Sequence, residues 1–281
     1  MKTDVAAIVI EPGAEELDPA RYRRRRRNVS VALGFLAPAL MMAAWQVCAM
    51  RGWVDRRLFS APSDVYRAAG DMISSGVLWD NLVPTIRRVG VGYALGASAG
   101  VVVGVVLGWY GLARAAFRPM LSALYTVPKL GVLPLFLLIF GLTETAKYAV
   151  IAYGMFLLIV LPTMDAVAKV PTSYLEAARS VGTPRLRLFV EVVMPSALPQ
   201  IFTTLRLAIG LAVLSVIGIE FVAANDGIGN LIWTSWNLFL PERMFVGIIT
   251  AALLGFAANQ LLRIVEHFAV PWQRSGNRVV I

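Results

Sequence analysis

Three charged residues inside long apolar runs are the residues of this sequence best placed to do chemistry. Lys129, Arg206 and Glu220 each interrupt a run of aliphatic and aromatic residues. Ionisable groups at such depth mark a solute path or a buried partner. Lys129 and Arg206 would suit an anionic solute. The alternatives are that Lys129 extends to the headgroups, that Arg206 is a buried structural ion, and that Glu220 is the partner of a backbone amide or an arginine.

Residues for enzymatic chemistry are scarce. The chain has one cysteine, Cys48, and one histidine, His267, so no multi-cysteine or multi-histidine metal site can form. No Walker A sequence occurs, and the one Gly-x-Ser-x-Gly sequence, Gly96 to Gly100, lies inside an apolar run rather than at a turn between a strand and a helix. We therefore expect no catalytic residue, no metal site and no cofactor held by this chain. A secondary transporter or an intramembrane enzyme is the alternative, although no inverted repeat is visible.

The composition indicates a membrane protein. Of 281 residues, 58% are hydrophobic and only 15% are charged, and the mean hydropathy is +0.70. A soluble domain has about a quarter of its residues charged, so a soluble globular protein is excluded. The net charge of +9 includes Arg21 and the run from Arg23 to Arg27, directly before the first apolar segment. Such a position indicates contact with anionic lipid rather than with nucleic acid.

Six apolar segments have about the length that crosses a bilayer as a helix, roughly 20 residues. We expect an all-α polytopic membrane protein with transmembrane helices at 29–50, 89–112, 119–142, 148–164, 195–224 and 244–262. The shortest, 148–164, is expected to extend back toward Thr145. Strands of a membrane barrel alternate apolar and polar residues and are about half as long as these segments, so a barrel is excluded. The first segment is too long for a cleaved signal core and is expected to be retained.

The charges between these segments predict the orientation and the parts of the chain. Arginine and lysine favour the cytoplasmic side, which places both termini inside. The first loop fits this rule poorly because it carries six arginines, and an interfacial or folded segment would explain them. The expected parts are a basic tail, a first helix, an extracytoplasmic or interfacial segment, a core that includes a cytoplasmic loop at 171–194, and a cytoplasmic C-terminal tail: 1–28, 29–50, 51–85, 86–270 and 271–281.

Two segments contain patterns that a plain helix would not need. In the second, glycine recurs at every fourth residue, at Gly92, Gly96, Gly100, Gly104 and Gly108. This spacing predicts one bare helix face for close packing, within one subunit or alternatively at a subunit interface or a sliding surface. In the third, Pro128 and Pro134 flank Lys129 and predict a broken helix. Broken backbone at this depth requires a protein or water-filled surrounding.

The loop at 171–194 predicts two short helices at a tight turn. Ser173 and Glu176 have the spacing of a capping box, and Gly182 is placed to end the helix in a left-handed conformation. Thr183 would cap a second helix that opens at Pro184. The first helix offers a partly apolar knob of the kind that fits a groove on a soluble partner, formed by Tyr174, Leu175, Glu176, Ala177, Ala178 and Arg179.

This loop resembles that of a known family. The order Glu176-Ala177-Ala178, Gly182, Pro195 and Ala197-Leu198-Pro199 is similar to the signature of inner-membrane permease subunits of binding-protein-dependent ATP-binding cassette importers. Further blocks resemble the branch for nitrate, sulfonates, taurine and bicarbonate: Leu58 to Ser63, Thr85 to Tyr93, Val127 to Leu130, Pro134 to Phe136, Phe140-Gly141, Arg206, Glu220 and Gly227 to Ile232. Together they cover about residues 55–265.

The resemblance implies a type I importer permease in a bacterial inner membrane, working by alternating access. Two copies would pair as a homodimer, and an extracytoplasmic binding protein would deliver a small, anionic solute. Two cytoplasmic ATPase subunits would bind ATP and Mg and receive the coupling residues, which are Tyr174, Leu175, Glu176, Ala177, Ala178, Arg179 and Gly182. Nitrate, sulfonates, taurine, bicarbonate and pyrimidine-type vitamin precursors are all compatible with this branch.

Overall fold

The computed structural model describes residues 19–53, 55 and 58–272, and its regular elements over these residues are all helical. The expected all-α class is confirmed. Five described helices have the length and composition of membrane spans: Ala32–Met50, Val77–Trp109, Glu144–Ala168, Arg185–Ala223 and Pro241–Ala269. Residues 1–18 of the expected basic tail and 273–281 of the expected C-terminal tail lie outside the described residues.

The chain divides into two units, and the first ends at Asp64. Its main element is α2, Pro19–Met50, which contains Pro38. The last turns of α2 are tied to the residues that follow by a reciprocal pair. The Gln46 amide donates to the Ser63 hydroxyl at 3.2 Å, and the Ser63 N–H donates to the Gln46 carbonyl oxygen at 3.2 Å. The second unit begins at Val65, inside α3 (Pro62–Ser74).

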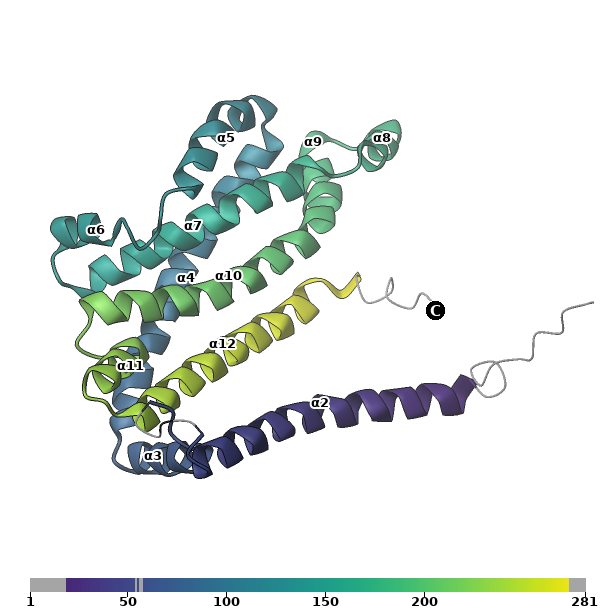
Figure 1. Ribbon diagram of the computed structural model, residues 1–281. Helices are drawn as coiled ribbons and strands as arrows, with labels where there is room; N and C mark the ends of the chain where they lie inside the picture. Colours follow the sequence, from purple (N-terminus) through teal and green to yellow (C-terminus); the bar gives the residue numbers. More distant parts are fainter. Residues whose placement is uncertain (1–18, 54, 56–57, 273–281) are drawn as a thin grey trace, which may run out of the picture. The chain divides into compact units, whose positions relative to one another are not determined.

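The second unit holds all the remaining helices. In chain order they are α4 (Val77–Trp109), α5 (Gly111–Tyr125), α6 (Leu133–Phe140), α7 (Glu144–Ala168), α8 (Thr172–Ser180), α9 (Arg185–Leu188), the π-helix η1 (Phe189–Val193), α10 (Met194–Ala223), α11 (Ile228–Asn237) and α12 (Pro241–Ala269). Figure 1 shows α7, α10 and α12 as neighbouring, similarly inclined helices, with α4 crossing behind them.

The helix α7 is the centre of this unit. Its buried residues Ile151, Met155 and Ile159 share one core with Ala208, Ala212 and Val216 of α10 and with Val89 and Ala97 of α4. Helices that cover α7 on several sides explain why it is the most buried of the candidate spans. A second cluster joins α3, α4, α10, α11 and α12 around Ile228.

Six spans were predicted, whereas five helices among the described residues have the length and composition of a span. The largest differences are at the second and third predicted segments. The second helix begins at Val77, not at Val89 as predicted, so Arg87 and Arg88 belong to a helix rather than to the loop before it. The third segment is not one helix: α5 ends at Tyr125 and α6 begins at Leu133. The break predicted from Pro128 and Pro134 is therefore confirmed.

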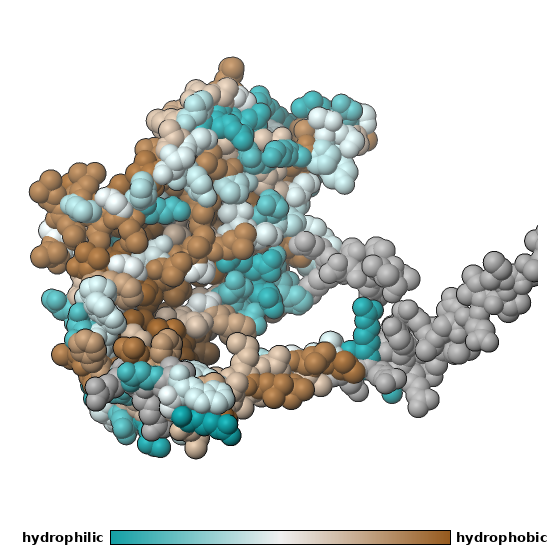
Figure 2. Space-filling view, in the orientation of Figure 1, coloured by the Kyte–Doolittle hydropathy of each residue, from teal (hydrophilic) through white to brown (hydrophobic). Residues whose placement is uncertain are grey.

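Apolar side chains cover much of the outer surface of the helices. Leu112, Leu138 and Leu142 are each more than four-fifths exposed, which would be costly in water. Figure 2 shows hydrophobic residues over α6, and hydrophilic residues gathered around α8 and α9. This division agrees with apolar helix sides in lipid and a polar end at the membrane surface.

Candidate functional site

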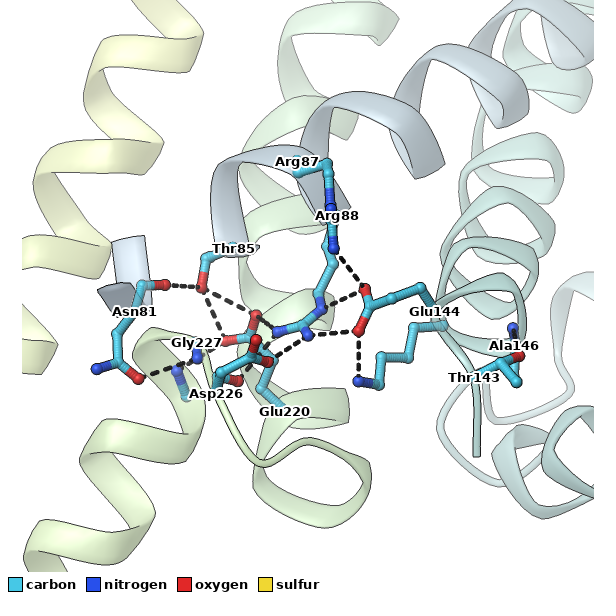
Figure 3. A network of polar contacts seen from close by, with 12 residues as sticks. Asn81, Thr85, Arg87, Arg88, Thr143, Glu144, Ala146, Glu220, Asp226 and Gly227 are labelled. Carbon is cyan, nitrogen blue, oxygen red and sulfur yellow. Dashed lines mark hydrogen bonds and ion pairs between the residues drawn. The ribbon is translucent and has the colours of Figure 1, made fainter. Parts of the chain in front are cut away.

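One buried arginine organises a network of polar contacts among α4, α7, α10 and the link to α11 (Figure 3). Arg88 of α4 has a side chain with no exposed surface. Its Nε and Nη2 donate to the two carboxylate oxygens of Glu144, at 2.9 and 2.6 Å. Its Nη1 donates to Glu220 at 2.8 Å and to the Asp226 carbonyl at 3.0 Å. Nη2 also pairs with the Asp226 carboxylate. Arg88 therefore joins α4, α7, α10 and the link to α11.

The carboxylate of Glu220 is fully engaged in the same network. It accepts hydrogen bonds from the Thr85 hydroxyl at 2.9 Å and from the Gly229 N–H at 2.8 Å. The Thr85 oxygen also accepts the Ile228 N–H at 2.8 Å, and the side-chain Oδ1 of Asn81 accepts the Gly227 N–H at 3.0 Å. These bonds satisfy backbone donors at the first turn of α11, which lack partners within the helix.

Charges in this network balance. Lys147 donates to Glu144 at 2.7 Å, and Arg87 lies 3.7 Å from the same carboxylate. Three cations, Arg87, Arg88 and Lys147, thus face the carboxylates of Glu144, Glu220 and Asp226. A buried ion pair is stable only when its hydrogen bonds are made and its partners are present. We refer to this set of residues, with Thr85, as the Arg88 clamp.

Backbone shape at Gly227 and Gly229 is fitted to the clamp. Gly227 has φ +105°, and a Cβ there would lie 2.6 Å from Glu220 Oε2. A Cβ on Gly229 would lie 2.7 Å from Glu220 Cβ. Only glycine allows the chain to fold this closely over the carboxylate.

Sequence reasoning placed Glu220 on its own and did not identify Arg88 as its partner. Glu220 was a candidate for the solute path, but the structure buries it completely. The placement matches the other interpretation, a partner of an arginine and of backbone amides. A signal was present: the blocks at Thr85 to Arg88, at Glu220 and at Gly227 to Gly229 were each part of the family resemblance, and the fold brings these three blocks together.

The five spaced glycines of α4 face α7. A Cβ on Gly92 would lie 2.5 Å from Ile151 Cγ2, and one on Gly108 would lie 2.6 Å from Val167 Cβ. Gly96, Gly100 and Gly104 meet Met155, Ile159 and Thr163 in the same way. Both helices contribute every fourth residue, so their axes approach closely over about four turns. The contact is within one chain, and we call it the glycine seam.

Lys129 lies in the break between α5 and α6. Its aliphatic stem packs on Gly154 of α7, where a Cβ would lie 3.3 Å from Lys129 Cδ. Its Nζ lies 5.3 Å from the centre of the Tyr125 ring. In the described part of the chain no carboxylate pairs with this ammonium. It is held by packing and by a cation–π contact, which leaves its charge available.

Arg206 differs because its charge is matched. Its guanidinium lies 3.1 Å from Glu266 of α12. It lines a pocket of about 690 Å³ between α5, α7, α10 and α12, together with Gln200, Thr204 and Asn259. The structure therefore does not bring Lys129, Arg206 and Glu220 into one group: Lys129 is in the break, Arg206 is paired with Glu266, and Glu220 is in the Arg88 clamp.

The predicted knob is the helix α8, and none of its residues is buried. Its end is closed as predicted: Gly182 has φ +74°, its N–H donates to the Arg179 carbonyl at 2.9 Å, and the Thr183 N–H donates to the Ala178 carbonyl at 3.2 Å. This pair of bonds is a Schellman motif. It fixes the direction in which the chain leaves α8.

Both predicted side-chain caps in this loop are wrong. Pro171 precedes α8 and Thr172 is its first residue, so Ser173 lies within the first turn and makes no cap with Glu176. Pro184, not Thr183, precedes α9. Pro184 has extended backbone (φ −68°, ψ 153°) and is itself the residue before the first helical one, so Thr183 lies one position too early to cap α9.

A single helical rod joins this loop to the Arg88 clamp. The helices α9, η1 and α10 run without interruption from Arg185 to Ala223, 39 residues, or about 58 Å. In η1 the Met194 N–H donates to the Phe189 carbonyl, five residues back. Pro195 follows and has no N–H to donate, so the wider turn lies where the regular ladder is interrupted.

Comparison with known proteins agrees with this architecture. Residues 96–269 match the family described as binding-protein-dependent transport system inner membrane component. The putative aliphatic sulfonates transport permease protein SsuC of Bacillus subtilis (strain 168) is 30% identical over 275 residues, which are 98% of this chain and 99% of the relative. The nitrate import permease protein NrtB of Leptolyngbya laminosa is 30% identical over 257 residues, 88% of this chain and 89% of the relative.

A solved structure shares the fold. An inward-facing form of the MetNI methionine ABC transporter matches with a TM-score of 0.56 and 20% identity, covering 67% of this chain and 95% of the solved one. The family match spans more than half of the sequence, and the relatives are matched over nearly their whole length. The chain therefore belongs to the family of inner-membrane components of binding-protein-dependent transport systems.

Proposed function

We propose that two copies of this importer permease form one solute pathway, that two cytoplasmic ATPase subunits bind its α8 helices, and that an extracytoplasmic binding protein delivers the solute. Membership of the family favours an ATP-driven importer over a secondary transporter or an intramembrane enzyme. The chain itself is the pathway-forming, non-catalytic subunit.

The observation that carries this proposal is the form of α8. It projects from the unit with no buried residue, yet it is fixed at its end by the Schellman motif and followed by the 39-residue rod. An exposed helix joined stiffly to a span is suited to transmit movement from a docked partner. In this arrangement the loop and both termini lie in the cytoplasm, and the Arg88 clamp lies on the other side.

A small oxyanion is the solute class that we favour. SsuC and NrtB are named for aliphatic sulfonates and nitrate, both negatively charged. Lys129, unpaired among the described residues and held in the helix break, is the cation placed to meet such a solute. Arg206 is already matched by Glu266 and would contribute less net charge.

We expect substitutions at Gly182 to show whether the left-handed backbone at this position, rather than the glycine itself, is what docking requires. Gly182→Val should abolish ATPase docking and transport because a β-branched residue does not adopt φ +74°. Gly182→Asn should retain most activity, since asparagine tolerates the left-handed region. Co-purification of the ATPase subunit and ATP-dependent uptake in proteoliposomes measure the difference.

Glu176→Lys tests the exposed face of α8 in the same assays. It reverses a charge without altering the backbone, and docking should be lost. The matched control is Glu191→Lys, also exposed but outside α8. Full docking and transport in both Glu176→Lys and Gly182→Val would refute the assignment of α8 as the coupling helix.

We expect Lys129→Met to reduce uptake of an anionic solute by roughly ten-fold or more at limiting concentration. A hydrogen bond to a charged group contributes about 1.5–3 kcal/mol, and methionine preserves the packing on Gly154 while removing the charge. Lys129→Arg should retain most of the uptake. Equal uptake by all three proteins, with normal stimulation of the ATPase, would remove Lys129 from the pathway.

A further inference from the structure

The pocket beneath α8 contains an unusual concentration of arginine. It has a volume of about 530 Å³ and lies between the ends of α4 and α7, the start of α5, and the α8–α9 loop. Arg114, Arg179, Thr183 and Arg185 contribute to its wall. Among the residues that the structure describes, none of those lining this pocket is acidic. Three unopposed positive charges around one hollow favour an anion.

Two of these arginines are held by contacts that leave donors free. Arg114 Nη1 donates to the Gly108 carbonyl at 2.9 Å, at the end of α4. The Arg185 guanidinium lies 5.8 Å from the centre of the Trp109 ring. Neither contact consumes the whole fork of five N–H donors. By contrast, Arg118 of α5 and Arg187 of α9 are paired with Asp165 and Glu191, at 2.7 and 3.5 Å.

An apolar groove adjoins the basic pocket and shares Trp109 and Arg185 with it. The groove measures about 460 Å³, and its other lining residues are Val105, Val106, Tyr110, Leu186 and Phe189. Val106, Tyr110 and Leu186 are largely exposed. The boundary between the two hollows is thus formed by an arginine stacked on a tryptophan, a pair suited to the level of lipid headgroups.

We propose that the two hollows together bind one anionic phospholipid, with its phosphodiester in the arginine pocket and an acyl chain in the groove. A free oxyanion would occupy the pocket but would make no contact with the apolar groove. The acidic side chain of a partner protein would likewise leave the groove empty. The continuity of a basic and an apolar hollow at the end of membrane spans fits an amphiphile with one negative head.

The bound lipid would bridge elements that otherwise touch little. Its phosphate would contact α5 through Arg114 and the α8–α9 loop through Arg179 and Arg185. Figure 1 shows these elements at the same end of the unit. The lipid would thereby restrain the coupling loop against the ends of α4 and α7. Lipid binding itself requires only that this end lies at a membrane surface, so it can be tested apart from the proposed transport function.

The test measures lipid retention by the full chain. The protein is reconstituted into nanodiscs of phosphatidylethanolamine with a minor fraction of phosphatidylglycerol, and native mass spectrometry counts the phosphatidylglycerol that stays bound. Arg114→Gln/Arg185→Gln should weaken retention roughly 30-fold, which corresponds to about 1 kcal/mol for each arginine. Arg118→Gln/Arg187→Gln removes the same charge from the same two helices, and retention should remain near the level of the unmodified protein.

Two further measurements decide the source of the anion. Leu186→Gln should weaken retention of phosphatidylglycerol, whereas binding of inorganic phosphate should be unchanged. If inorganic phosphate displaces the lipid readily and Leu186→Gln has no effect, the lipid assignment is wrong and the pocket is a free-oxyanion site. Equal losses in both double variants would also overturn it. So would loss of ATPase co-purification in Arg114→Gln/Arg185→Gln with full lipid retention, because the pocket would then receive a partner protein.

Discussion

Replacing Arg88 with methionine is expected to destabilise the permease by about 3–5 kcal/mol, the cost of removing one partner of a buried ion pair. Glu220 would keep its carboxylate in a site with no exposed surface, while Glu144 and Asp226, which are partly exposed, can recover water. Thermal unfolding in detergent and the yield of folded protein measure the loss.

A matched control lies one residue away. Arg87 is on the same helix, its side chain is more than half exposed, and it lies 3.7 Å from Glu144. A pair of this kind contributes about 0–1 kcal/mol, so Arg87→Met should unfold close to the unmodified protein. Similar destabilisation by Arg87→Met and Arg88→Met would show that the burial of Arg88 is not what matters.

A double substitution separates charge from packing. Arg88→Met/Glu220→Met removes both buried charges, so it should be more stable than Arg88→Met alone. If the double variant is no more stable, the loss in the single variant does not arise from an unpaired Glu220. This comparison remains informative where Arg88→Met yields little folded protein, because recovery of folded protein is itself the readout.

The second large effect is expected from a single methyl group in the glycine seam. A Cβ on Gly96 would lie 2.7 Å from Met155 Cβ and would also strike the Ala152 carbonyl, which is backbone and cannot rotate away. Gly96→Ala should therefore destabilise the protein by about 1–3 kcal/mol through overpacking. A lower unfolding temperature and faster proteolysis are the measurements.

Gly90→Ala is the control for helix propensity. Gly90 is on α4 as well, but no atom lies within 4 Å of its added Cβ. Alanine is intrinsically the better helix former by about 1 kcal/mol, so this variant should be neutral or slightly stabilised. If Gly96→Ala were as stable as Gly90→Ala, the close contact between α4 and α7 would not require glycine at position 96.

Local signals in the sequence predicted local features well. Apolar runs predicted the approximate positions of the long helices, Pro128 and Pro134 predicted the break, and Gly182 predicted the left-handed end of α8. Each of these depends on the residue itself and on close neighbours. The caps at Ser173 and Thr183 were predicted by the same kind of reasoning and were wrong, because two prolines took the positions before the helices.

The Arg88 clamp could not be predicted from spacing along one helix, because its residues come from different helices. Arg88 and Glu220 are separated by 132 residues, and charge counting assigned Arg88 to a loop because α4 was predicted to begin too late. An arginine beside an apolar run has the same appearance whether it faces water or a buried carboxylate. Only the packing of α4, α7 and α10 distinguishes the two cases.

The π turn at Phe189–Val193 determines how α9 and the loop before it are rotated about the axis of α10. Each residue of an α-helix advances the chain by about 100° and 1.5 Å, so the one additional residue in this turn offsets the azimuth of α9 and the loop relative to α10. On one side of this turn, α10 packs against α7 and contributes Glu220 to the Arg88 clamp. On the other side lies the exposed helix α8. Adding or removing a single residue here would rotate α8 about the axis of α10 by about 100°. The residues of α10 that pack on α7 would stay the same.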